Sequence, residues 1–381
     1  MVAITLFVAL LAVSCGDGAS GGPVPLPPDG SGAGTPGNPF IVGSAASLLK
    51  VGTNSGGWGM DACYKQTADI ILGGLWVPIG TFANPFTGTY DGGNNTIAGL
   101  TVSRAANYNG FFSYVDGGTI KGLRLTNVAI ITGSNNYAGA VAGMITGGAM
   151  ISNCSATGTI SASYEAGGIA GYCVNDSIVE HCSSGVTVTG TGDYIGGVVG
   201  VNYGIVKYCS SSGAVKGHTY TGGVVGHIYG PGLVQNCYAT GSVTATGNYT
   251  GGVVGLNDNG TVEYSYASGA VSGASRAGGI VGHNADNGTV RNCAALCASV
   301  TASADNAGRV AGLNTATVND CFAFQYMDLS SVDSIHPENG SPVDSGQYSG
   351  QAWWQSGPPA GPGFSFGPWK WDSARMLPAL K

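Results

Sequence analysis

A Gly-rich pentapeptide recurs along this chain every 26 to 30 residues, and no other feature restricts the possible folds as strongly. The copies are variants of Gly-Gly-Val-Val-Gly, and a degenerate first copy occupies residues 110–114. The others lie at residues 139–143, 167–171, 196–200, 222–226, 251–255, 278–282 and 308–312. A fixed period of about 20–50 residues indicates repeats that stack on one another, because each repeat buries its apolar face only against its neighbours.

An aliphatic residue followed three positions later by Cys runs in phase with the pentapeptide. The Cys slot is filled at Cys154, Cys182, Cys209, Cys237, Cys293 and Cys321, by Ser265 once, and by Leu100 and Leu123 in two earlier copies. A further aliphatic residue follows six positions later, as at Ile160 and Val188. Short β-branched patches bounded by Gly, Asn and Ser are typical of strands, and no repeat contains a stretch with helical periodicity.

We therefore predict an all-β fold, a right-handed parallel β-solenoid of about nine coils of about 28 residues over residues 96–327. A leucine-rich repeat would need regular Leu spacing and a helical side, and a propeller blade would need four strands and at least about 40 residues. The residue before the Cys slot is Gly, Asn, Asp, His or Tyr, and the Gly and Asn copies predict a sharp corner there.

Two further columns are polar. The residue two before the Cys slot is predicted to face solvent, with Glu180 beside Lys207 and Glu263 beside Arg291. Side-chain amides are expected to bond from coil to coil in a partial ladder of Asn202, Asn257, Asn284 and Asn314.

The N-terminal residues 1–14 predict a signal peptide, because residues 2–13 form an apolar run too short to span a bilayer. The run ends at Ser14 and Cys15, which resembles the lipobox of bacterial lipoproteins and makes Cys15 the predicted lipidation site. Ala12 and the lack of an early basic residue depart from that pattern, so a plain secretory signal and a buried segment remain alternatives. Residues 15–36, rich in Gly, Pro and Ser, are expected to be a flexible tether.

Residues 37–95 and 328–381 are expected to cap the solenoid, because exposed strand edges promote aggregation. The aromatic residues expected to shield the last coil are Trp353, Trp354, Phe364, Phe366, Trp369 and Trp371. A ligand-binding aromatic tail is the alternative for this segment.

Composition limits the partners and the cysteine chemistry. Lys and Arg number only 13 and the net charge is −7, which argues against a nucleic-acid partner.

Ten cysteines in an exported chain would suggest disulfides. Stacked coils, however, hold equivalent Cβ atoms about 4.8 Å apart, whereas a relaxed disulfide needs about 3.8 Å. The Cys slots are therefore predicted to be buried free thiols, and Cys63, Cys173 and Cys297 are left unassigned.

With these repeats and flanking segments, the chain resembles the GLUG-motif repeat proteins of bacterial cell surfaces. Beyond the pentapeptides, the resemblance rests on residues 36–49, 67–70, 76–80 and 85–97 and on a closing segment at 369–380. It implies parallel β-solenoids on exported surface proteins, with adhesion or binding as the assumed role. Some relatives attach such repeats to IgA-cleaving metallopeptidases with a His-Glu-x-x-His zinc motif, which is absent here: no His is followed by Glu.

Catalytic and metal-binding patterns do not emerge from the sequence. His227 and His283 occupy equivalent slots two coils apart, too far to share a zinc ion. Acidic residues are scattered singly, whereas carbohydrate-active enzymes on similar folds cluster them. Turn chemistry explains Asn-Asp-Asn-Gly at 257–260 better than calcium does. We predict no enzyme activity and no cofactor.

One column of tyrosines is the candidate binding face. It comprises Tyr108, Tyr137, Tyr164, Tyr194, Tyr220 and Tyr249, each just before a pentapeptide, and it ends at Arg276 and Asn306. The column either stacks to stiffen the solenoid or binds a partner, because Tyr is enriched at binding hot spots. The overall prediction is a lipid-anchored, non-catalytic surface scaffold for a host or matrix protein or a glycan. A carbohydrate-active enzyme on this fold and a purely structural spacer are the alternatives.

Overall fold

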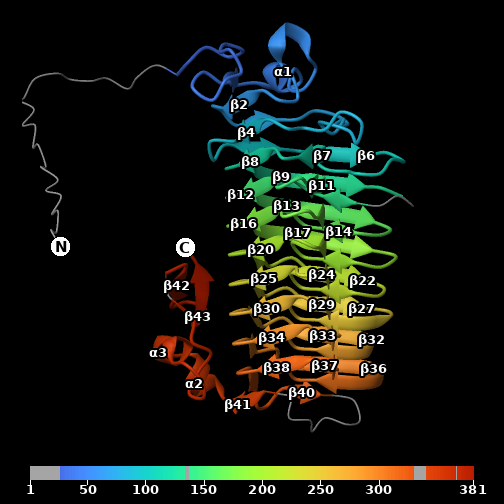
Figure 1. Cartoon of the computed structure of the whole chain (residues 1–381), viewed down its shortest axis with the longest axis vertical. Helices are drawn as coiled ribbons and strands as arrows, with labels where there is room; N and C mark the ends of the chain where they lie inside the picture. The colour runs from blue at the N-terminus through green and yellow to red at the C-terminus, as the bar shows by residue number, and fades with distance from the viewer. Residues whose placement is uncertain (1–25, 134–136, 330–339, 366) are drawn as a thin grey trace, which may run out of the picture.

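In the computed structural model, which describes residues 26–133, 137–329, 340–365 and 367–381, parallel strands stack into one long solenoid. Figure 1 shows the coils piled along the long axis of the molecule, from β2 near one end to β38 near the other. Each typical coil contributes strands to three sheets, and equivalent residues of successive repeats pair in register. The predicted parallel β-solenoid is therefore confirmed.

The first sheet has eleven strands among the described residues and is the most regular. Its strands, in spatial order, are β1 (Phe40–Val42), β2 (Cys63–Gln66), β4 (Thr89–Asp91), β8 (Thr119–Lys121), β12 (Met150–Ser152), β16 (Ile178–Glu180), β20 (Ile205–Lys207), β25 (Leu233–Gln235), β30 (Thr261–Glu263), β34 (Thr289–Arg291) and β38 (Thr317–Asn319). The stack thus begins before residue 96, because β1, β2 and β4 of the N-terminal segment already pair within this sheet.

The second sheet has eight strands in the described part of the chain, formed by the second halves of the pentapeptides and the residues after them. They are β7 (Phe112–Asp116), β11 (Ala142–Thr146), β15 (Ala170–Cys173), β19 (Val199–Asn202), β24 (Val225–Tyr229), β29 (Val254–Asp258), β33 (Val281–Ala285) and β37 (Ala311–Asn314).

The third sheet covers the remaining side and is broken into 22 short strands within the described ranges. They are β3 (Ile70–Ile71), β5 (Thr96–Ala98), β6 (Thr101–Ser103), β9 (Arg124–Ile131), β10 (Ala138–Gly139), β13 (Ser155–Ala162), β14 (Ala166–Gly167), β17 (Ser183–Gly190), β18 (Ile195–Gly196), β21 (Ser210–Ser211), β22 (Val215–Gly217), β23 (Thr221–Gly222), β26 (Tyr238–Ala239), β27 (Val243–Ala245), β28 (Asn248–Gly251), β31 (Tyr266–Ala267), β32 (Val271–Gly278), β35 (Ala294–Ala295), β36 (Ser299–Gly308), β39 (Phe322–Phe324), β40 (Asp328–Leu329) and β41 (Ser341–Val343). Its breaks follow the Gly, Ser and Thr turns of each repeat.

Helices are short and lie outside the coils. They are α1 (Ala45–Leu48), a 3-10 turn at Ser55–Gly57, α2 (Ser345–Tyr348) and α3 (Gln351–Gln355). Ser44 and Asp344 cap α1 and α2 by accepting hydrogen bonds from the backbone amides three residues on. The C-terminal strands β42 (Trp369–Asp372) and β43 (Leu377–Leu380) form an antiparallel hairpin.

The core runs the length of the solenoid as columns of identical side-chain types. One fully buried column of the first sheet contains Ile120, Ile151, Val179, Val206, Val234, Val262 and Val290. The Cys slots are buried and their thiols are free, as predicted. Each thiol donates to a backbone carbonyl, as Cys209 Sγ does to Lys207 O at 3.2 Å. The ladder therefore packs as small apolar residues.

The corner before each Cys slot is confirmed by its backbone. Eight of the nine predicted positions lie in this corner with a positive φ between 48° and 60°, and they are Gly122, Asn153, His181, Tyr208, Asn236, Tyr264, Asn292 and Asp320. The prediction is wrong for Gly99, because Tyr90 rather than Ile97 pairs with Ile120 and Asn94, with a φ of 61°, stands beside Gly122. Tyr and His rarely adopt this left-handed conformation, so the stacked neighbours hold them in it.

The polar columns are confirmed in their pairing. Lys207 Nζ lies 3.2 Å from Glu180 Oε2, and Arg291 Nη2 lies 2.6 Å from Glu263 Oε2. Their predicted exposure is wrong for two members, because Ser152 and Glu263 are buried. The Asn ladder forms in its last three members, with Asn257 Nδ2 donating to Asn284 Oδ1 at 2.8 Å and Asn284 Nδ2 to Asn314 Oδ1 at 2.9 Å. The prediction is wrong for Asn202, because Ile228 stands between it and Asn257.

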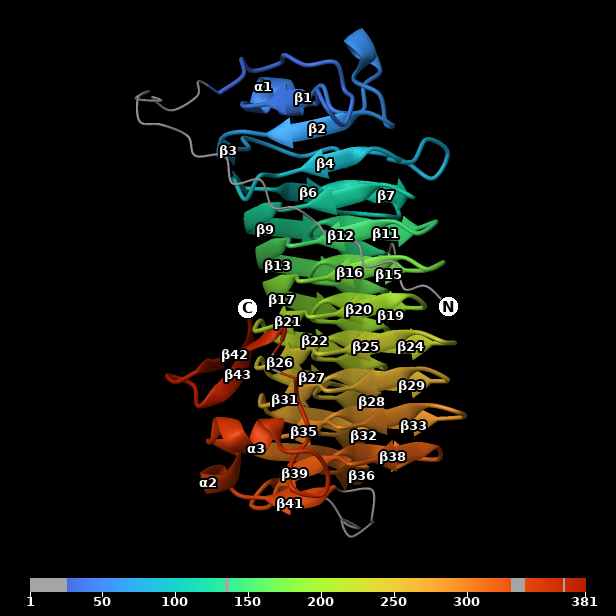
Figure 2. The same cartoon turned by 60° about the vertical axis from the view of Figure 1, so that its left-hand side comes forward.

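The C-terminal segment follows a different course from the one we expected. We expected its aromatic residues to shield the last coil, but they pack along the flank of several coils (Figure 2). Trp354, Phe364 and Trp369 form one cluster with Phe322 of the last coil and with Tyr266 and Tyr238 of earlier coils. Phe366 lies outside the described residues. The physical reason is that Tyr238 and Tyr266 present an apolar stack, with ring centres 5.1 Å apart, that must be covered.

Candidate binding surface

The tyrosine column lies at the corner between the third and second sheets. Tyr108, Tyr137, Tyr194, Tyr220 and Tyr249 all have a positive φ, between 56° and 68°. The residues that follow them pair in register from coil to coil, so the tyrosines occupy one slot.

Tyr164 is the exception, and its predicted place in the column is wrong. Ala166 pairs with Ile195, so Glu165 rather than Tyr164 stands beside Tyr194. Glu165 has the left-handed φ of the slot, 43°. Tyr164 is 43% exposed and lies over Gly192, where a Cβ would come within 2.7 Å of its ring. The column therefore holds five tyrosines with a carboxyl group between the second and the third.

The last Gly of the pentapeptide makes this corner possible. A Cβ on Gly226 would lie 2.7 Å from the carbonyl carbon of Tyr194, and one on Gly255 would lie 2.6 Å from that of Tyr220. The backbone of the tyrosine slot therefore occupies the space that a side chain would need. The repeated Gly and the repeated Tyr are two halves of one packing arrangement.

The tyrosine rings stack along the column. The ring centres of Tyr194 and Tyr220 are 4.9 Å apart and nearly parallel, and those of Tyr220 and Tyr249 are 5.1 Å apart at 1°. Tyr108 and Tyr137 stack at 4.9 Å. The predicted stacking is thus present on both sides of Glu165.

A second set of aromatic side chains, which the sequence analysis did not assign to the surface, comes from the second sheet. Tyr172, His227 and His283 each follow the last Gly of a pentapeptide by one residue, and this fixed offset is the signal that could have found them. His227 lies beside the stacked pair Tyr194 and Tyr220, with ring centres 5.5 and 5.4 Å away. His283 stacks on Tyr249 at 5.3 Å.

Together these rings form one continuous surface, which we call the aromatic band. Ring contacts connect its members without interruption through Tyr108–Tyr137, Tyr137–Tyr172, Tyr172–Tyr203, Tyr203–Tyr229, Tyr229–His227, His227–Tyr194, Tyr194–Tyr220, Tyr220–Tyr249 and Tyr249–His283. Most members are half-buried, and Tyr229 is 46% exposed. The band is thus both a stacking ladder and an accessible surface.

Charged and titratable groups mark particular coils of the band. The Arg276 guanidinium carbon lies 4.9 Å from the Tyr249 ring centre, and Arg276 donates a hydrogen bond to the Tyr249 hydroxyl. Burial lowers the pKa of His227 to about 4, so this imidazole is neutral at physiological pH. Burial, with a smaller effect of the Asp193 carboxylate, raises the pKa of Glu165 to about 7.

Metal and acid–base clusters are not formed within the described ranges. His227 and His283 are separated by Leu256 on the intervening strand, as the repeat spacing predicts. No group of three or more His, Cys, Asp or Glu in these ranges is placed to hold a metal ion. In the Asn-Asp-Asn-Gly turn, Asn257 Nδ2 donates to Gly260 O at 3.1 Å, in agreement with turn chemistry.

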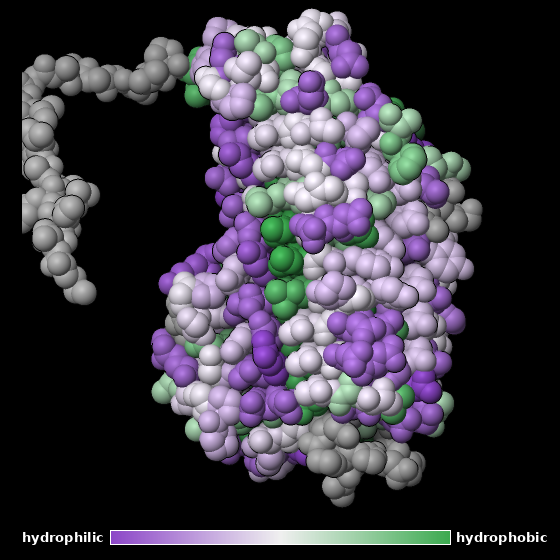
Figure 3. All heavy atoms as spheres, viewed as in Figure 1, coloured by the Kyte–Doolittle hydropathy of each residue, from purple (hydrophilic) through white to green (hydrophobic). Residues whose placement is uncertain are grey.

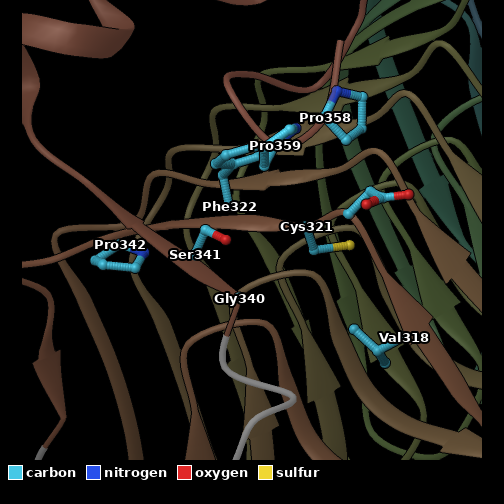
Figure 4. Close-up of a pocket in the computed structure, with 9 residues that line it drawn as sticks. Val318, Cys321, Phe322, Gly340, Ser341, Pro342, Pro358 and Pro359 are labelled. Atoms are coloured by element: carbon cyan, nitrogen blue, oxygen red, sulfur yellow. The ribbon is translucent and has the colours of Figure 1, made fainter.

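A pocket of about 380 Å³ lies where the C-terminal segment leaves the last coil. Figure 4 shows Phe322 with Pro358 and Pro359 on one side of it and Val318 set apart from them. Asp320 is its only charged lining residue. With one carboxylate and mainly apolar or small neighbours, the pocket offers little recognition chemistry.

An apolar stripe crosses the middle of the first sheet. Figure 3 shows hydrophobic side chains gathered over β16, β20 and β25. Ile178, Ile205 and Leu233, paired on these strands, are each partly exposed. The stripe spans only the central coils, since Thr takes the equivalent place at Thr261 and Thr289.

With this geometry described, the chain can be compared with known proteins. Residues 134–161, 217–244, 246–272 and 273–301 match the family described as the GLUG motif. Four repeats of this solenoid therefore match the GLUG motif. The matched GLUG repeats carry Tyr137, Tyr220 and Tyr249 of the band as well as Arg276.

Two similar proteins accompany the GLUG match. Halomucin of Haloquadratum walsbyi is 34% identical over 142 residues, which is 34% of this chain and 2% of halomucin. The chain therefore spans a very small part of that relative. The solved structure of a candidate immunoglobulin A1 protease from Bacteroides ovatus has 18% identity and a TM-score of 0.49, covering 92% of this chain and 94% of that one. At this score we base no argument on it.

The predicted membrane attachment concerns residues that are not described. Cys15, the predicted signal peptide at 1–14 and the first part of the tether lie outside the described residues. In the part of the chain that the structure describes, no helix has the length and apolar character needed to cross a bilayer.

Proposed function

We propose that this chain is an exported cell-surface protein whose GLUG solenoid is a non-catalytic binding scaffold, and that an extended glycan chain lies along the aromatic band. The observation that carries the proposal is the unbroken ring contact from Tyr108 to His283. A sugar ring presents an apolar face of C–H groups, and the stacked Tyr rings present a row of ring edges and hydroxyl groups that is positioned at little entropic cost. A row of half-exposed rings about 4.8 Å apart suits a polymer better than a compact ligand.

The scaffold role fits the way in which the band is built. The five tyrosines of the column are held in one left-handed slot by stacking and by the pentapeptide Gly residues, so this part of the surface is rigid before a ligand arrives. A preorganised surface loses little conformational entropy on binding. The same rigidity would serve a spacer, and the binding experiment distinguishes the two roles.

The test replaces the central tyrosines without disturbing the corner. Tyr194, Tyr220 and Tyr249 are changed together to Asn, because Asn306 follows the last of the tyrosines in this column and also has a positive φ, 52°. Wild-type protein is screened on an array of glycans and matrix proteins, and the hits are titrated with the variant. We expect affinity to fall at least about 10-fold, because each stacked ring contributes on the order of 1 kcal/mol.

The matched control alters a stacked pair on another corner. His181 and Tyr208 also have a positive φ, and their ring centres are 4.7 Å apart, but they lie outside the band. The His181→Asn, Tyr208→Asn double variant should bind as the wild type does. A wild-type protein that binds nothing on the array would leave the spacer role standing, and equal losses in both variants would remove the band from binding.

The lipid anchor is a separate part of the proposal. Cys15 follows Ser14 at the end of an apolar run, which supports lipidation at Cys15. Mass spectrometry of protein from its native host should show a chain that begins at Cys15 and carries acyl groups. The Cys15→Ser variant should leave the membrane fraction. An unmodified N-terminus elsewhere would contradict the anchor.

A further inference from the structure

The aromatic band is interrupted at one coil by a carboxyl group. Glu165 occupies the slot that Tyr fills in the two coils before it and the three after it. Its backbone follows the others, since its amide donates to Asp193 O and its carbonyl accepts from the Ala138 amide, both at 3.1 Å. Only the side chain differs, so the ring that would fill this level is missing.

Tyrosine rings border the Glu165 side chain. Tyr137 and Tyr194 stand on the neighbouring rungs, about 4.8 Å away along the solenoid. Tyr172 stands nearly perpendicular to Tyr137, with ring centres 5.3 Å apart at 84°. The Glu165 carboxylate raises the pKa of all three phenols, together with their burial, which places it within electrostatic reach of each.

The Glu165 carboxyl group lacks a partner of its own. Its Oε2 atom is buried and has no hydrogen-bond donor among the described residues. The charged group that acts on it is Asp193, which carries the same sign. Asp193 Oδ1 in turn accepts from the Thr219 amide at 3.0 Å and lies 3.0 Å from His218 Nδ1, so the nearby imidazole is already engaged. For a partly buried carboxyl group beside another acid, a buried oxygen without a donor is costly unless the group is protonated or meets an external cation.

We propose that Glu165, Tyr137, Tyr172 and Tyr194 form a subsite for a protonated amine carried by the polymer that lies on the band. The inference rests on the proposed function and adds the chemical class of the ligand. An ammonium group would donate an N–H to Glu165 Oε2 and contact the faces of the tyrosine rings. Aromatic rings around a cation are a known mode of ammonium recognition, and the attraction is strongest where water is excluded.

The position of the subsite within the band would select the direction in which the polymer binds. Arg276 carries a positive charge at Tyr249, at the far end of the stacked column, whereas Glu165 and Asp193 carry negative charge near its beginning. A polymer with an amine on one sugar and neutral or acidic groups further along would match both ends in only one direction. The band would thereby bind its ligand in a defined polarity.

The experiment uses pairs of small probes that differ mainly in charge. n-Butylammonium is compared with 1-butanol at pH 8, and glucosamine with glucose at pH 7, where its more weakly basic amine still carries a proton. Both comparisons use ligand-observed NMR titration of the folded chain. Such fragments should bind with a Kd on the order of 1–10 mM. The expected result is that at least one cation binds at least about 10-fold more tightly than its neutral counterpart. The butylammonium pair represents a lysine-like amine and the glucosamine pair an amino sugar, so the pair that responds identifies the source.

Variants assign the effect to the subsite. Glu165→Gln keeps the shape of the side chain, and Glu165→Tyr restores the tyrosine column; both should lose the preference for the cation. Glu180→Gln, on the first sheet and paired with Lys207, is the matched control and should keep it. Circular dichroism of each variant verifies that the solenoid is folded.

Two outcomes would overturn the subsite: equal binding of cation and neutral probe by the wild type, or an unchanged preference in folded Glu165→Gln. Either result can be distinguished from a failure of the proposed glycan-binding function. Polymer binding on the array that survives Glu165→Gln but is lost in the triple tyrosine variant would retain the scaffold and remove the amine subsite.

Discussion

Trp369 donates a hydrogen bond from Nε1 to Oδ1 of Asn236 at 3.0 Å, across 133 residues of sequence. Asn236 is one of the left-handed corner residues, and both side chains are buried. This bond, with Tyr266 OH donating to Pro378 O at 2.6 Å, fastens the C-terminal segment to the flank of the solenoid. The segment is therefore held by a few specific contacts rather than by strand pairing along its whole length.

The first prediction concerns this attachment. Trp369→Phe keeps an aromatic ring but leaves Asn236 Oδ1 without its donor, which should cost about 1–3 kcal/mol. We expect faster hydrogen exchange and protease cleavage within residues 344–381 while the coils remain protected. Lys370→Ala, at an exposed position of the same strand, is the control and should behave as the wild type does. Simultaneous loss of protection in the coils would show that the segment is part of the cooperative core.

The second prediction concerns the pentapeptide glycines. Gly255→Ala places a Cβ 2.6 Å from backbone atoms of Tyr220 and Thr221, and backbone cannot move aside as a side chain can. We expect a loss of at least about 1–3 kcal/mol in the free energy of unfolding, measured by denaturant titration. Gly73→Ala is the matched control, because nothing lies within 4 Å of its added Cβ. Equal stability of the two variants would refute the close-packing role of the motif.

The third prediction concerns the thiols. Burial raises the pKa of Cys173 and Cys297 to about 12, and it raises that of Cys182 and Cys209 well above the ordinary value. In the native protein, alkylation should therefore reach Cys63, which is partly exposed, far faster than the eight other described cysteines, which are buried. After denaturation without reductant, all nine should react. A linked Cys182–Cys209 peptide would contradict the packing of the ladder.

The fourth prediction is a pH dependence that arises from His227. Its folded-state pKa of about 4 lies below the ordinary value of about 6.5, so the unfolded chain takes up a proton first as the pH falls. The free energy of unfolding should fall by up to about 3 kcal/mol between pH 6.5 and 4. His227→Phe should remove this component, because Phe can occupy the place beside Tyr194 and Tyr220 without titrating. Identical slopes for the two proteins would disprove it.

The fifth prediction concerns Glu165, for which the free energy of unfolding should change with pH in the opposite direction from that expected for His227. The folded-state pKa of Glu165, about 7, lies above the ordinary value of about 4.3, so the folded protein holds the extra proton and loses stability as the pH rises through this range. Asp193, His218 and the three bordering tyrosines also face this group, so the wild type is compared with Glu165→Gln. Binding of n-butylammonium at the subsite should strengthen from pH 6 to 8, because this amine stays protonated and only the carboxylate pairs with a cation. Binding that weakens over this range would contradict the subsite.

The candidate site shows where sequence patterns stop being sufficient. The tyrosines at positions 108, 137, 194, 220 and 249 lie two residues before a pentapeptide and fall in one column, as their spacing predicts. Tyr164 lies three residues before one, and that single step moves its ring out of the slot and brings Glu165 in. In stacked coils a shift of one residue moves a side chain to a different position on the surface. A tyrosine one residue out of phase therefore does not join the column. Tyr172 and His227 belong to the band because, at this corner, the tyrosine rings lie against side chains of the second sheet.

The sequence by itself determined the stack, because a repeat of about 28 residues with β-branched patches and phased Gly buries its core only against identical neighbours. It also determined which columns are buried, polar or sharply turned, since in-register stacking places equivalent residues side by side. Only the tertiary structure decided what lies between columns and on the flank: the carboxyl group among the tyrosine rings, and the contact of Trp369 with Asn236. Those contacts join residues that share no repeat position, so they depend on turn geometry and on the path of a segment that has no period.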